Sequence, residues 1–110
     1  MGTDNSVIRG TLDLLILRVL RAGPMHGWGI CDLIQTWSAE ALTVQQGSLY
    51  ASLHRLTREG WIRSYWAETE NNRRARYYEL TRAGERQLAV ETDHWQRLSA
   101  GVARVLAFDA

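Results

Sequence analysis

Residues 45–80 read QQGSLYASLHRLTREGWIRSYWAETENNRRARYYEL, and this stretch decides the fold. Three of its leucines are spaced by four and then three: Leu49, Leu53 and Leu56. That spacing predicts a helix over 45–59 with one buried stripe, and Gly60 is a typical residue to end it. Aromatic and apolar residues then mark two strands over 61–67 and 76–80, on either side of a polar, Asn-containing turn. The stretch therefore predicts a helix followed by a β-hairpin with a charged tip.

Two more helices are predicted before this stretch. Residues 6–21 carry apolar side chains at helical spacing on nearly every side, so that helix must be covered on nearly every side. Gly23 and Pro24 end it. A shorter helix is predicted over 26–38, and residues 39–44 form a connection without Pro or Gly.

After the hairpin, Thr81 is a suitable N-cap for a last helix that runs to about Leu106. Its apolar residues repeat every seven positions in two sets: Leu88, Trp95 and Val102, and Leu98 and Val105. Such a seam is typical of helices that pair with a partner. A helix about 37 Å long exposes more apolar surface than so small a chain can cover, so we expect a homodimer. The alternative is a helix that folds back on its own core.

Composition narrows the function. The 110 residues hold 13 Arg, no Lys and 12 acidic residues, a formal net charge of +1. The chain as a whole is thus not strongly basic, but residues 55–86 hold eight Arg against five Glu, a local net charge of +3. A single Cys31 excludes an internal disulfide, although it leaves a redox role open.

Several functional classes find no support in the sequence. Its three histidines, His26, His54 and His94, are too far apart for a typical metal site, and we expect neither a metal nor a cofactor. No Gly-rich phosphate loop or Gly-flanked nucleophilic Ser is present, so an enzyme is not expected. With no apolar run long enough for a membrane span and no secretory signal, a cytoplasmic protein is expected.

Three helices followed by a hairpin form the order of a winged helix-turn-helix, here residues 1–80, with a C-terminal dimerisation helix over 81–110. The fold class is thus mainly α with a small β-hairpin. In this arrangement the third helix enters the major groove and the hairpin contacts the flanking backbone. Short polar residues and Arg, which reach base edges and phosphates, mark the predicted DNA-binding positions. They are Gln45, Gln46, Ser48 and Arg55 on an exposed helix face and Asn72, Arg73, Arg74 and Arg76 in the hairpin.

The chain also resembles the PadR family of bacterial transcriptional regulators, in particular its short members with one C-terminal helix. The resembling segments are GTLDLLIL (10–17), GPMHGWGI (23–30), GSLYASLHRL (47–56), GWI (60–62), NNRRARYY (71–78) and LTRAG (80–84). The family usually has Tyr at the position of Trp28 and Pro at the position of Ala51. The resemblance adds Tyr50 to the DNA-binding residues, and the alternative is that Tyr50 packs on the hairpin.

By this resemblance, the protein is a homodimeric repressor at an inverted-repeat operator, and its last helix embraces the first helix of the partner. The residues assigned to this contact are Leu12, Leu15, Leu88, Trp95, Leu98 and Val102. Some family members bind aromatic molecules between the subunits near a Trp that matches Trp95, so a small aromatic effector is a candidate partner. The alternative is that Trp95 only packs the seam. A second hypothesis is a ligand-binding or protein-interaction module of the same fold without operator binding.

Overall fold

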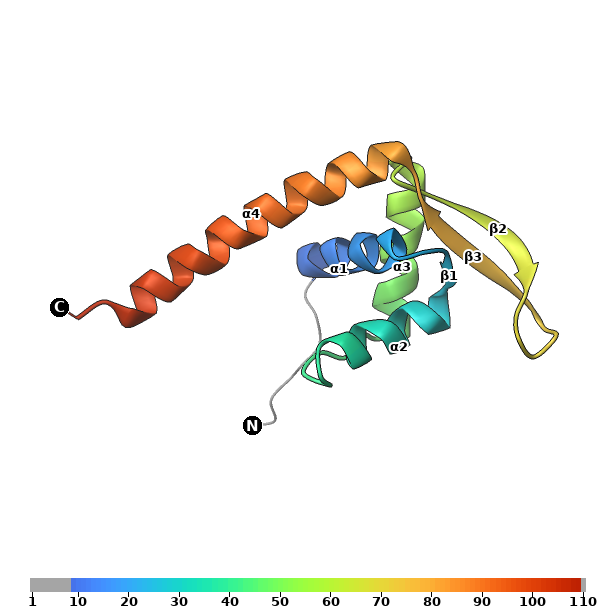
Figure 1. The fold of residues 1–110 in the computed structure, drawn as a ribbon, viewed down its shortest axis with the longest axis horizontal. Helices are drawn as coiled ribbons and strands as arrows, with labels where there is room; N and C mark the ends of the chain where they lie inside the picture. Colours follow the sequence, from blue (N-terminus) through green and yellow to red (C-terminus); the bar gives the residue numbers. More distant parts are fainter. Residues whose placement is uncertain (1–8, 110) are drawn as a thin grey trace.

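The computed structural model describes residues 9–109 as four helices and a three-stranded sheet (Figure 1). The elements in chain order are α1 (Arg9–Arg21), β1 (Met25–His26), α2 (Gly27–Trp37), α3 (Gln46–Arg58), β2 (Ile62–Glu68), β3 (Arg74–Leu80) and α4 (Arg82–Ala107). The predicted winged helix-turn-helix order and the long last helix are both confirmed. The predicted start of the first helix at Ser6 lies outside the described residues.

The element ends follow from local chemistry. Gly60 has a φ of +81°, and its N–H donates to the carbonyl of Thr57 while that of Trp61 donates to Leu56. This pair of bonds is a Schellman motif, which confirms Gly60 as the residue that ends α3. At the start of α4, the hydroxyl of Thr81 accepts the N–H of Gly84 at 3.0 Å, which confirms the predicted N-cap.

The sheet holds one strand that the sequence did not predict. β1 pairs antiparallel with β3, so the strand order is β1-β3-β2. β3 is also two residues longer than predicted, because the hairpin register carries pairing out to Glu68 opposite Arg74. Two residues are too few to produce an alternating pattern, which is why β1 was missed.

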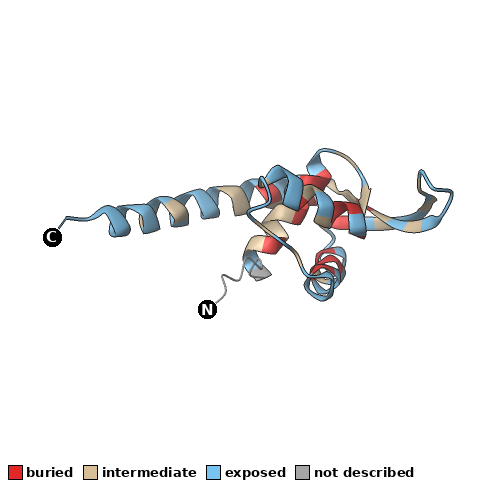
Figure 2. Cartoon of the chain, turned by 90° about the horizontal axis from the view of Figure 1, so that it is seen from below, coloured by how far each residue is buried: buried red, intermediate tan, exposed pale blue. Residues whose placement is uncertain are grey.

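The core forms around α1, which lies between the other helices and the sheet (Figure 1). Its buried residues are Leu12, Ile16, Leu17, Val19 and Leu20, and the three predicted leucines of α3 are fully buried against them. The covering of α1 on most sides confirms the expectation for this helix. Only the start of α4 joins the core, through Leu88, and the rest extends away as an exposed helix (Figure 2).

Candidate nucleic-acid interface

The N-terminal half of α3 presents a polar face to solvent. Gln45, Gln46 and Ser48 are exposed there, as predicted. Tyr50 is 48% exposed, and a Cβ on Gly27 of α2 would lie 2.9 Å from its hydroxyl oxygen. One side of the Tyr50 ring thus packs against the start of α2, and not only against the hairpin. The other side of the ring is open to solvent.

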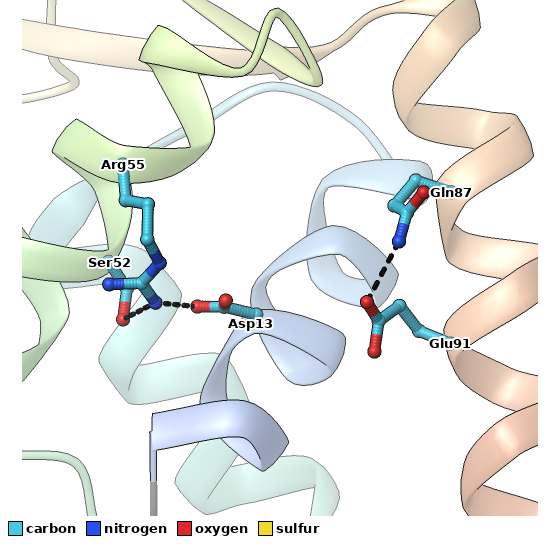
Figure 3. Close-up of polar contacts among 5 residues, drawn as sticks. All are labelled: Asp13, Ser52, Arg55, Gln87 and Glu91. Carbon is cyan, nitrogen blue, oxygen red and sulfur yellow. Dashed lines mark hydrogen bonds and ion pairs between the residues drawn. The ribbon is translucent and has the colours of Figure 1, made fainter.

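Arg55, which the sequence placed on the exposed helix face, is instead largely buried. Its guanidinium donates to the carboxylate of Asp13 on α1 and, at 3.3 Å, to the hydroxyl of Ser52 (Figure 3). The exposed fractions of the Arg55 and Asp13 side chains are 19% and 17%. Arg55 therefore ties α3 to α1, and we leave it out of the proposed DNA contacts.

The hairpin of β2 and β3, here called the wing, has a tight tip over residues 69–73. The N–H of Thr69 donates to the carbonyl of Arg73 at 2.7 Å, and Asn72 adopts a left-handed φ of +59°. Asn tolerates this conformation better than most residues, which confirms the predicted turn. The tip holds Asn72 and Arg73 exposed at the end of the wing.

Behind the tip, two arginines lie against an aromatic ring on one face of the wing. The guanidinium carbons of Arg74 and Arg76 are 5.6 and 5.9 Å from the ring centroid of Trp66. The Nε of Arg76 also donates to the hydroxyl of Ser64 at 3.0 Å. These contacts hold both cations on the same side of the sheet. Sequence reasoning treated Trp66 only as a strand residue, since its place opposite Arg76 depends on the hairpin register.

This face of the wing borders a concave cleft of about 690 Å³ that reaches to α2 and α3. Tyr50 lines it from α3, and Trp66, Arg73, Arg74 and Arg76 line it from the wing. The cleft thus brings one predicted helix residue together with three predicted wing residues. Aromatic and arginine side chains around an open space suit a polyanion with exposed sugar and base edges.

The start of α2 closes the other side of the cleft. The Nδ1 atom of His26 accepts the N–H of Gly29 at 2.9 Å, so His26 is the N-cap of α2. This bond satisfies one of the backbone N–H groups at the start of α2.

The residues predicted for subunit contact fall into two groups. Leu12 and Leu88 are buried in the core of their own chain, because the start of α4 packs on α1, and Leu15 is half-buried there. Trp95, Leu98 and Val102 are exposed along α4. A shallow hollow of about 480 Å³ lies along the C-terminal part of this stretch, where Leu98, Val102, Val105 and Leu106 line it together with Arg97 and Gly101. The apolar face left for a partner is thus the C-terminal part of α4.

Residues 9–109 contain neither a candidate membrane span nor a candidate metal site. No helix there is both long and apolar enough to cross a membrane. No group of three or more His, Cys, Asp or Glu within residues 9–109 is placed to hold a metal ion. The single Cys31 is half-buried on α2, where burial raises the pKa of its thiol.

Comparison with known proteins gives concordant results. A model of the transcriptional regulator PadR-like family matches residues 16–90. An uncharacterized protein of Lysinibacillus sphaericus is 26% identical over 91 residues, which cover 83% of this chain and 84% of that protein. The structure of a transcriptional regulator from Clostridium thermocellum is similar, with a TM-score of 0.79, 29% identity, and coverage of 92% of this chain and 97% of that one. A PadR-like transcriptional regulator from Bacillus cereus shares the fold with a TM-score of 0.77 at 23% identity, covering 91% of this chain and 95% of its own.

Proposed function

Since the chain belongs to the PadR-like family of transcriptional regulators, we propose that it is a cytoplasmic homodimeric repressor that binds an inverted-repeat DNA operator. The observation that supports operator binding best is the cleft between α3 and the wing, where Tyr50 faces three arginines across one open space. The family consists of transcriptional regulators rather than enzymes, so the cleft is assigned to binding and not to catalysis.

The two sides of the cleft have different roles in this proposal. Ser48 and Tyr50 project from α3, together with Gln45 and Gln46 at its start, and they read base edges in the major groove. Asn72, Arg73, Arg74 and Arg76 contact phosphates, which fix the position of the protein on DNA without reading sequence. The Trp66 ring holds the last two of these arginines toward the duplex.

Dimerisation is supported by the exposed apolar face of α4. Trp95, Leu98 and Val102 are each about half exposed, and Val105 and Leu106 are more so. In the proposed dimer this face embraces α1 of the partner and places two copies of α3 one helical turn of DNA apart, about 34–36 Å. An aromatic effector that stacks on Trp95 between the subunits would then release the operator.

The test is a gel shift with DNA from upstream of the gene, measured over a series of salt concentrations. Binding should fall steeply with salt, since arginine–phosphate contacts release counterions, and the log–log slope should lose about 0.9 for each contact removed. Arg73→Ala with Arg74→Ala should weaken binding to all sequences and flatten this slope. Arg63→Ala is the matched control, because Arg63 is paired with Glu79 in the same hairpin and does not line the cleft.

Base reading is tested separately with Ser48→Arg, which places a bulky side chain at an exposed position near the start of α3. Loss of operator preference with retained folding is expected. If the variant keeps full preference, or if the double Arg variant keeps the salt slope, DNA binding through this cleft is refuted. The chain would then be a ligand-binding or interaction module of the same fold.

A further inference from the structure

A second concave surface adjoins the cleft between the wing tip and the start of α2, and His26, Trp28, Thr69 and Asn71 border both. This groove has a volume of about 300 Å³. Met25, His26 and Trp28 line it at the start of α2, Tyr77 lines it from β3, and Asp32 and Glu70 lie on its two sides. Alternate residues of a strand point to opposite faces, so Tyr77 faces away from the side that carries Arg74 and Arg76.

The aromatic rings at this groove are already ordered against one another. The rings of His26 and Trp28 stack with their centroids 5.6 Å apart and an interplanar angle of 24°. Tyr77 meets His26 edge-on, at 5.3 Å and 72°, and stacks on Tyr65 at 5.9 Å. Trp28 is nonetheless 69% exposed, so most of its indole surface has no protein partner within the described chain.

The charge at the groove is negative. Asp32 lies one helical turn after Trp28, on the same side of α2, and Glu70 faces it from the wing tip. No arginine lines the groove among the described residues. The Nδ1 atom of His26 accepts the N–H of Gly29, so this atom is already occupied by a contact within α2.

Aromatic faces beside carboxylates form the pattern that recognises organic cations, through cation–π attraction and direct charge attraction. We propose that this groove binds a lipophilic organic cation, such as a quaternary ammonium or phosphonium ion with aryl groups. The indole of Trp28 supplies the main contact face, and Asp32 and Glu70 supply the counter-charge. His26, Trp28, Thr69 and Asn71 line both this groove and the cleft, so the bound cation lies directly beside the proposed DNA-binding surface.

Cation binding is measured on the 110-residue chain without DNA, so its outcome does not depend on whether the chain binds an operator. Tetraphenylphosphonium chloride is titrated calorimetrically at low ionic strength, with sodium tetraphenylborate as an anion of the same shape. The phosphonium ion should bind and the borate should bind at least about tenfold more weakly, since the sign of the charge is all that differs. Equal binding of the two ions would overturn the proposal, as would no binding of the cation.

Variants locate the bound cation. Trp28→Ala should weaken phosphonium binding by up to about fivefold, because an exposed cation–π contact contributes up to about 1 kcal/mol. Trp37→Ala, at the other end of α2, removes a second exposed indole away from the groove and should leave the affinity unchanged. Both positions are exposed, so both variants should fold. Equal effects of the two substitutions, or an effect of Trp37→Ala alone, would place the cation elsewhere.

The charge contribution is measured with Asp32→Asn and Glu70→Gln together. These isosteric changes should weaken phosphonium binding by about fivefold at low salt and by less at 0.5 M salt, where exposed charges are screened. They should also improve borate binding relative to phosphonium binding. An unchanged ratio of the two affinities would show that the carboxylates do not contribute, and the assignment to a cation would fail.

Discussion

The Asp13–Arg55 pair joins α1 to α3, and its removal should destabilise the fold. Arg55 also donates to Ser52, which is buried, so the guanidinium is held from two sides. Exposed ion pairs contribute about 0.2–1 kcal/mol, whereas loss of one partner from a buried pair costs about 3–5 kcal/mol. With both side chains roughly four-fifths buried, Asp13→Ala should cost about 2 kcal/mol.

The assay is thermal or urea unfolding at one fixed protein concentration, because the proposed dimerisation would make apparent stability concentration-dependent. A loss of about 2 kcal/mol corresponds to a fall in Tm of about 8–16 °C for a domain of this size. In the cycle of Asp13→Ala, Arg55→Ala and the double variant, the coupling energy should be about 1–2 kcal/mol. Additivity within about 0.5 kcal/mol would refute the inference that this pair fixes the two helices.

Operator binding separates the structural role of Arg55 from the DNA-reading role that the sequence predicts. At a temperature where all variants are folded, Arg55→Ala should keep operator affinity within about threefold of the unsubstituted protein and keep the salt slope. A loss of one phosphate contact per subunit would instead lower the slope by about 1.8 per dimer. That result, with an unchanged free energy of unfolding, would show that Arg55 contacts DNA.

Three further outcomes are expected. Gly84→Ala should lower the free energy of unfolding by about 1–3 kcal/mol, because the added Cβ would overlap the backbone carbonyl of Trp61. Gly47→Ala should be neutral or slightly stabilising, because a Cβ there meets nothing within 4 Å. Burial raises the pKa of Cys31, so iodoacetamide at pH 8 should modify the native thiol at least about tenfold more slowly than the urea-unfolded one, and equal rates would contradict this. Leu98→Glu should convert the dimer to monomers in sedimentation experiments without loss of helix content, and an unchanged mass would exclude the α4 face as the subunit contact.

The features that could be predicted from the sequence are those set by residues close together in the chain. The leucine spacing in α3, the Gly60 ending and the Thr81 cap each depend on a few neighbouring positions, and each is confirmed. The resemblance to a family came from several such short segments in the same order. Short local patterns were therefore enough to predict most of the helices and strands, and the order of these elements was enough to predict the fold.

What could not be predicted depends on residues distant in the sequence. A helical wheel places Arg55 on an outward face, but it cannot show that Asp13, 42 positions earlier, meets the guanidinium there. The contact of Trp66 with Arg74 and Arg76 requires the hairpin register, and the aromatic groove requires β1 beside β3. Each is a tertiary contact between separate segments of the chain, and neither segment's sequence shows which residues of the other it will contact.

The net charge of a segment likewise does not show which of its charged side chains are paired in the fold. Residues 55–86 have a net charge of +3, which indicates a local excess of positive charge. In the fold, Arg55 is paired with Asp13 and Arg63 with Glu79, so neither adds a free cation to the surface. The unpaired excess that faces the cleft is the group of three wing arginines, with Trp66 beside two of them. The groove lined by Asp32 and Glu70 adjoins this cleft at Trp28, so two surfaces of opposite charge preference lie side by side between the wing and α2.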